Sequence, residues 1–268
     1  MIDKLSWVTI YPEIVLLVMA CIIALVDLSD ASPRRTRTYV LTLATLAVVA
    51  VLSGLAALGG KTAYGFGGMV VSDPMGNWLK CFATVALMVT LVYGRPYAAD
   101  REMLRGGELF TISMFALLGM FVMISGSNFL LIYLGLELLT LSSYALVALR
   151  RDNAVASEAA MKYFVLGAMA SGFLLYGMSM MYGATGSLDI NEVYKAIASR
   201  KVDHQVLVSI LNRGAHQAKQ LDARAHAEAV FVAESLNADA GDIFHHDVRQ
   251  ALVSRAAVNQ PRDVGVIE

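Results

Sequence analysis

Glu137 lies in the middle of a long apolar stretch, where an ionisable side chain costs on the order of 3 kcal/mol to insert into a membrane. The stretch reads FLLIYLGLELLTLSSYAL, residues 129–146. About nine residues of helix place Glu137 roughly 14 Å deep, near the midplane of a bilayer. Tyr133, Thr140 and Tyr144 would share its helix face, so a polar stripe crosses the span. The spacing fits a proton-carrying carboxyl group; the alternative is a structural carboxyl group held neutral by a hydrogen bond to a neighbouring helix.

Lys162 is the second candidate, in the stretch EAAMKYFVLGAMASG, residues 158–172. Glu158 stands four residues earlier, which is the favourable order for a helical ion pair, and the lysine could extend to the membrane surface. The other interpretation is that Lys162 faces Glu137 across a packed helix pair. A carboxylate and an amine that exchange partners can relay a proton, because each charge changes the pKa of the other. The small-residue pairs Gly167/Ser171 and Ala168/Gly172 favour close packing of this helix.

Other ionisable residues carry weaker signals. Glu13 and Asp27 lie near the ends of the first apolar segment and are expected at the membrane interface, and Lys80 is expected to extend to the membrane surface. The run 60–62 (GKT) is not a phosphate loop, because the earlier glycine of that motif is missing. The run 245–247 (HHD) is expected to be solvated, and no metal site is predicted.

The elements that must position these groups are membrane helices. Of the 268 residues, 57% are apolar and 16% charged, with a mean hydropathy of +0.59, whereas soluble domains carry about 25% charged residues. The composition excludes a soluble globular enzyme, a disordered chain and a secreted disulfide scaffold. A membrane-spanning helix needs about 20 mostly apolar residues. Six segments of the first 187 residues qualify: about 8–28, 38–59, 75–94, 108–125, 128–149 and 158–183.

The sequence changes character after the sixth segment. Residues 188–201 predict a short amphipathic helix on the surface, and residues 202–268 form a polar tail that contains all five histidines and no spanning run. The predicted fold class is therefore an all-α membrane protein with about six transmembrane helices and a polar, poorly specified tail. The net charge of −1 gives no electrostatic reason to expect nucleic acid.

Lysine and arginine in the connecting loops predict the orientation. The first, third and fifth loops carry eight of these residues, and the opposite side carries two, Lys4 and Lys61. Because positive loops stay in the cytoplasm, the N-terminus is expected outside. The first segment is expected to be retained rather than cleaved as a signal peptide, because its apolar stretch is long and contains Glu13 and Asp27.

Three stretches together resemble a known family. They are YPEIVLLVMACIIALVDL at 11–28, YLGLELLTLSSYALVAL at 133–149 and EAAMKYFVLGAMASGFLLYG at 158–177. They are similar to subunit N of the bacterial proton-pumping NADH–quinone oxidoreductase, respiratory complex I, an antiporter-like membrane subunit. The resemblance covers about residues 1–200 and leaves the tail unrelated.

The resemblance implies a function. In that family a glutamate on the fifth helix and a lysine on the sixth form part of the proton path, and by motif position these are Glu137 and Lys162. The chain would contribute to proton translocation coupled to electron transfer from NADH to quinone, as a translocase subunit without redox catalysis of its own. It would bind no cofactor, because flavin and iron–sulfur clusters belong to other subunits. Its partners would be the other membrane subunits of complex I, the lipid bilayer and protons, in the bacterial inner membrane.

The sequence also departs from the family. The family continues with a broken seventh helix and further helices that carry key lysines, and residues 202–268 match none of these. A frameshift, a chimeric gene and a genuine short variant remain open, and an incomplete pump is the expectation. Two other functions also remain open: a subunit of a multi-subunit Na⁺/H⁺ antiporter, and a non-conducting membrane scaffold or truncated gene product.

Overall fold

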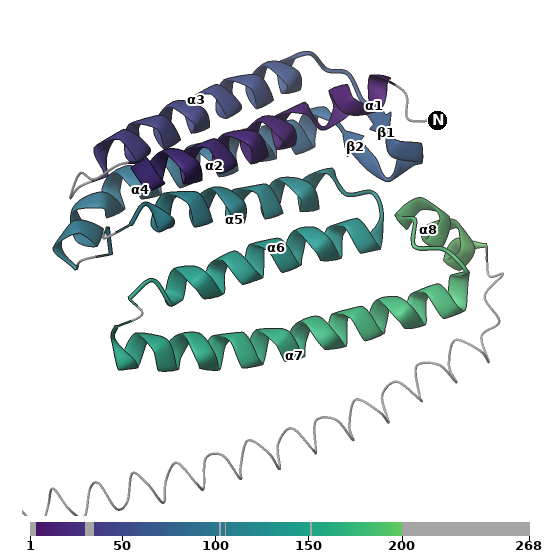
Figure 1. Cartoon of the computed structure of the whole chain (residues 1–268). Coiled ribbons are helices and arrows are strands. Elements are labelled where there is room, and N and C mark those ends of the chain that lie inside the picture. The colour runs from purple at the N-terminus through teal and green to yellow at the C-terminus, as the bar shows by residue number, and fades with distance from the viewer. Residues whose placement is uncertain (1–3, 30–34, 102, 105, 151, 200–268) are drawn as a thin grey trace, which may run out of the picture. The chain divides into compact units, whose positions relative to one another are not determined.

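The chain folds as a set of long helices, as its apolar segments predict (Figure 1). This computed structural model describes residues 4–29, 35–101, 103–104, 106–150 and 152–199. In this described part six helices are long and apolar enough to cross a membrane, which confirms the predicted fold class. They are α2 (Tyr11–Ser29), α3 (Thr36–Leu58), α4 (Pro74–Asp100), α5 (Glu108–Ser125), α6 (Phe129–Val147) and α7 (Ala154–Thr185). The predicted tail, residues 202–268, lies outside the described residues.

Side-chain caps mark the starts of several helices, and α4 and α6 are examples. The Asp73 carboxylate accepts a hydrogen bond from the Gly76 backbone N–H at 3.2 Å, and Pro74 follows as the first helical residue, where its missing N–H has little cost. Asn128 caps α6 in the same way by accepting from the Leu130 N–H at 2.9 Å. Only residues 126–128 separate α5 from α6, and these two helices pack as an antiparallel pair (Figure 1).

Helix α4 is longer than the sequence predicts. The run 94–96 (GRP) predicted an end at residue 94, yet α4 continues through Pro96 to Asp100. A proline inside a helix removes one backbone donor, but contacts on both sides of it stabilise the last turns here. Ala98 is buried in the core, and the Arg95 guanidinium lies 4.0 Å from the centre of the Tyr39 ring on α3.

Helix α5 is the centre of the hydrophobic core. It packs against α2, α4 and α6, and it contributes more of the buried apolar cluster than any other helix. Helix α7 differs, since it contacts α6 and the short helix α8 (Ile190–Ala198). In the most apolar 18-residue window of each helix, 44% of α5 is buried within the described chain, against 6% of α7. The buried cluster consists of Leu16, Ala20, Ile23, Leu46, Val49, Leu91, Ala98, Leu104, Phe110, Met114, Leu117, Leu118 and Phe121.

A small hairpin that the sequence did not predict lies at one end of the bundle. Strands β1 (Ala63–Gly65) and β2 (Val70–Ser72) pair antiparallel across the 3-10 turn η1 (Phe66–Gly68), next to the short helix α1 (Lys4–Thr9). Three-residue strands are too short to show an alternating pattern.

The three-residue link between α5 and α6 holds this end of the bundle together. The Ser127 N–H donates to the Met69 carbonyl of the hairpin at 2.9 Å. On its other side, the Ile190 N–H at the start of α8 donates to the Ser127 carbonyl at 3.2 Å. The hairpin and α8 are therefore both anchored to the same link.

Candidate functional site

A close helix crossing positions Glu137. A Cβ atom added at Gly119 on α5 would lie 2.6 Å from the Leu139 backbone nitrogen, and one added at Gly135 on α6 would lie 2.8 Å from the Gly119 carbonyl oxygen. Glycine at both positions therefore lets the two backbones approach each other. Glu137 follows Gly135 by two residues, so its backbone is fixed against the core helix α5.

The Glu137 carboxylate is incompletely paired. Its Oε1 atom is buried and has no hydrogen-bond partner in the described part of the chain. The Tyr133 hydroxyl lies beside the carboxylate, while the Thr140 hydroxyl donates to the Glu137 backbone carbonyl at 3.1 Å. A buried acceptor without a donor is costly. A proton on the carboxyl group, a water molecule or a donor from another chain would satisfy it.

Tyr144, the last member of the predicted polar stripe, joins α6 to α7. Its buried ring contacts Tyr163 and Phe164 edge to face, with ring centres 4.8 and 5.6 Å away. A Cβ atom added at Gly167 would overlap the Tyr144 hydroxyl, so the absence of a side chain at Gly167 makes room for this contact. Gly172, from the other predicted small-residue pair, faces open space.

Lys162 contacts Glu158 on its own helix. The Lys162 Nζ atom lies 2.6 Å from Glu158 Oε1, and the two side chains are 64% and 63% exposed. This is the helical ion pair that the four-residue spacing predicts. No ion pair joins Lys162 to Glu137 in the part of the chain that the structure describes. The structure thus does not bring the two predicted relay residues into contact, and their joint role stays a prediction.

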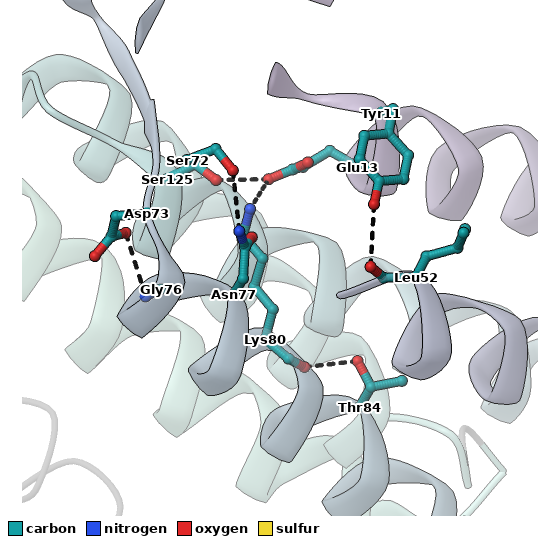
Figure 2. A network of polar contacts seen from close by, with 10 residues as sticks. All are labelled: Tyr11, Glu13, Leu52, Ser72, Asp73, Gly76, Asn77, Lys80, Thr84 and Ser125. Carbon is teal, nitrogen blue, oxygen red and sulfur yellow. Dashed lines mark hydrogen bonds and ion pairs between the residues drawn. The ribbon is translucent and has the colours of Figure 1, made fainter. Parts of the chain in front are cut away.

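A second ion pair is buried between three helices. Lys80 Nζ on α4 lies 2.6 Å from Glu13 Oε1 on α2, and the two side chains are 1% and 9% exposed. The Ser125 hydroxyl at the end of α5 donates to the same Glu13 oxygen at 2.6 Å (Figure 2). The prediction that Lys80 extends to the surface is therefore wrong; Glu13 lies near the end of α2 as expected, but its side chain points into the bundle. The lysine does not need water because the carboxylate neutralises its charge inside the bundle.

The sequence did contain a signal for this pair. Asn77, Lys80 and Thr84 are spaced at i, i+3 and i+7, so they share one face of α4, and all three are almost fully buried. The Asn77 side-chain amide donates to Ser72 Oγ at 3.1 Å, and the Thr84 hydroxyl donates to the Lys80 carbonyl at 2.7 Å. The same kind of polar stripe identified Glu137. Applied to the third segment, it would have indicated a buried lysine.

Asp27 forms a polar cluster at the opposite helix end. Its carboxylate accepts hydrogen bonds from Thr38 Oγ1 at 3.0 Å, Arg35 Nη1 at 3.4 Å and the Gly107 N–H at 2.8 Å. These donors belong to the starts of α3 and α5. The position near the end of α2 agrees with the sequence, and the contacts show that Asp27 joins the ends of three helices.

Comparisons with known proteins show which sequence family and which proteins this chain resembles. Residues 126–215 match the sequence family described as NADH:quinone oxidoreductase/Mrp antiporter, TM. The chain is 76% identical over 208 residues to NADH-quinone oxidoreductase subunit N of Polaromonas naphthalenivorans, which covers 78% of this chain and 42% of that protein. The resemblance to subunit N is confirmed. Subunit N of Herminiimonas arsenicoxydans is 56% identical over 209 residues, covering 77% of this chain and 42% of that protein. The chain thus spans about two fifths of the length of these relatives of subunit N.

Solved structures agree with the antiporter-like fold. A chain of respiratory complex I from Thermus thermophilus with bound aureothin superposes with a TM-score of 0.55 and 30% identity, covering 67% of this chain and 38% of that chain. A chain of the archaeal membrane-bound sulfane sulfur reductase has a TM-score of 0.57 at 19% identity, covering 75% and 42%, and shows likeness of fold alone. Together with the six candidate spans, these matches identify an antiporter-like membrane protein. Its relatives named subunit N come from bacteria.

Proposed function

We propose that this chain acts as membrane subunit N of a NADH–quinone oxidoreductase and contributes to proton translocation coupled to electron transfer from NADH to quinone. The observation that carries the proposal is the 76% identity to a protein of that name. The position of Glu137 supports it, because a half-buried carboxyl group inside a spanning helix is the kind of group that a proton path uses. The partners are the other membrane subunits of that complex, and the location is the bacterial inner membrane.

Glu137 and Lys162 are the proposed relay residues. Glu137 takes up and releases the proton, because its Oε1 atom has no competing donor in the described chain. Lys162 modulates Glu137 by changing partner, with Glu158 as the partner in the arrangement described here. Departure of the ammonium group from Glu158 toward α6 would change the charge around Glu137 and so its affinity for a proton.

We propose that the chain binds no cofactor of its own and that NADH, quinone, flavin and iron–sulfur clusters are handled by other subunits. Within the described residues, no group of three or more histidine, cysteine, aspartate or glutamate side chains is placed to hold a metal ion. The proposed role of this chain is to move protons and to position the groups that move them.

The proposed topology places the N-terminus outside. The distribution of arginine supports it, since Arg35, Arg95 and Arg101 all lie at the helix ends that the sequence assigns to the cytoplasm. Single cysteines at Thr36 and Thr62, both exposed, test it. A membrane-impermeant thiol reagent applied from outside should label the Thr62→Cys variant and spare Thr36→Cys. The reverse pattern would invert the topology.

A sodium-transporting antiporter subunit is the second candidate, because the matched family description names both NADH:quinone oxidoreductase and Mrp antiporter. The distinguishing experiment uses NADH–quinone oxidoreductase purified from cells that carry this chain and reconstituted into proteoliposomes. After NADH and quinone are added, the pH of the lumen should change at the same rate in sodium-free buffer as in sodium-containing buffer. An absolute requirement for sodium would favour sodium transport, and failure of the chain to co-purify with the complex would contradict the first proposal and leave the antiporter subunit.

A further inference from the structure

The pair Glu13–Lys80 is more than a neutralised contact, because it leaves one carboxylate oxygen unused. Glu13 Oε1 accepts from both Lys80 Nζ and Ser125 Oγ at 2.6 Å, while Glu13 Oε2 is buried and has no hydrogen-bond partner in the described part of the chain. Buried acceptors are normally satisfied. The Oε2 atom is therefore a vacant acceptor on a side chain that is more than nine-tenths buried.

The helix ends around this site stabilise both charges. Glu13 is in the first turn of α2, where the helix dipole favours an anion, and Ser125 is the last residue of α5, where backbone carbonyls favour a cation. The Phe121 ring lies 5.7 Å from Lys80 Nζ and adds a weak attraction for the ammonium group. Lys80 thus retains favourable partners even when the carboxylate becomes neutral.

A polar connection leads from the site toward the hairpin. Asn77 lies one turn before Lys80 on the same face of α4, and its amide donates to Ser72 at the end of β2 (Figure 2). These residues stand at the helix ends that the proposed topology places outside. The pair therefore lies closer to that aqueous side than to the opposite ends of the same helices.

We propose that Glu13, Lys80 and Ser125 form a second proton-binding site, separate from Glu137, that takes its proton from the outer aqueous side. A hydronium ion from the outer aqueous phase gives its proton to Glu13 Oε2 and leaves as water; an O–H bond forms, and the charge of the pair changes from zero to +1. Lys80 keeps its three protons and remains with the carbonyl end of α5 and the Phe121 ring. Release to the outer side reverses the step, so no other reactant is needed.

Other titratable groups at this end are engaged differently. Tyr11 on α2 donates to the Leu52 carbonyl of α3 at 3.0 Å, and the Asp73 carboxylate caps α4. Lys61 and Tyr64 are exposed, and Cys81 projects from α4 toward Gly54 on α3. None of them supplies a donor to Glu13 Oε2 within the described residues.

Infrared difference spectroscopy of the assembled complex in oriented membrane vesicles tests the proposal. Lowering only the outer pH should produce a protonated-carboxyl C=O band that shifts in D₂O. Glu13→Gln should remove this band, Ser125→Ala should shift it by removing one donor to Oε1, and Glu137→Gln should leave it in place. Glu192→Gln, the same substitution at an exposed position on α8, is the matched control and should retain the band.

The double variant Glu13→Gln/Lys80→Met guards against a folding defect, because it removes both charges together. It should assemble and lack the band. Absence of any outer-pH-dependent carboxyl band in the unmodified complex, or its persistence in Glu13→Gln, would overturn the proposal and leave the pair as a static contact. A band lost in Glu137→Gln but not in Glu13→Gln would support the relay role of Glu137 while rejecting the second site.

Discussion

The ion pairs Glu13–Lys80 and Glu158–Lys162 join the same two kinds of group at the same distance, 2.6 Å, in opposite surroundings. The first is enclosed by α2, α4 and α5, and its lysine is 1% exposed; the second lies on one helix, and its lysine is 64% exposed. Distance alone therefore does not tell what an ion pair does. Burial decides whether the lysine is held by its neighbours or is free to change partner.

The same contrast extends to the helices. The region α2–α5 places its polar groups in contact across helices, as at Glu13 and at Asp27, around the core of α5. The region α6–α7 packs around an aromatic cluster at Tyr144, and its carboxyl group Glu137, like Glu13, has one oxygen without a hydrogen-bond partner within the described residues. We infer that the first region holds its titratable pair in a rigid frame, whereas the second leaves its lysine exposed and able to change partner.

The largest expected effect is on the proton path. Glu137→Gln keeps the shape and most hydrogen bonding of the side chain but cannot bind or release a proton. We expect NADH-driven proton translocation by the assembled complex to fall by about tenfold or more, consistent with loss of a positioned proton-transfer group, while the complex still assembles. Proton uptake in proteoliposomes measures it, with Glu192→Gln as the matched control. Normal pumping by Glu137→Gln would remove Glu137 from the mechanism.

The next effect concerns stability at the buried pair. Lys80→Met leaves Glu13 as an uncompensated buried charge, which costs about 3–5 kcal/mol for pairs of this kind. Glu13→Gln/Lys80→Met removes both charges, so it should recover most of that loss. Thermal unfolding of the two variants beside the unmodified protein measures the difference. Equal destabilisation by the single and the double variant would show that packing of the lysine chain matters more than its charge.

The sequence predicted one of these regions better than the other. Long apolar runs predicted the helices, and the polar stripe identified Glu137. The partners of Glu13 could not be predicted in the same way. Lys80 and Ser125 lie 67 and 112 residues from Glu13 in the sequence, and the three residues meet only when three helices pack. The hairpin was missed because its strands are too short for a periodic signal.

A smaller effect is expected where α6 meets α7. A Cβ at Gly167 would overlap the Tyr144 hydroxyl, whereas one at Gly172 meets nothing within 4 Å. Gly167→Ala should therefore destabilise the protein by about 1–3 kcal/mol, the usual cost of overpacking, and Gly172→Ala should not destabilise it. Thermal unfolding of the two single variants gives the comparison. Equal behaviour would mean that Tyr144 moves aside without cost and that it does not hold α6 against α7.

The smallest effect is expected at Glu158. Exposed ion pairs contribute little to stability, so Glu158→Gln should leave the unfolding temperature within the scatter of repeated measurements. Glu13→Gln, the same substitution in the buried pair, should lower it clearly. If Lys162 works by changing partner, Glu158→Gln should nevertheless change the rate of proton translocation, because it removes one of the two partners. A large fall in unfolding temperature for Glu158→Gln would mean that other protein covers this face of α7 in the assembled complex. In that case both pairs would be buried in the complex, and the difference in exposure between them would exist only in the isolated chain.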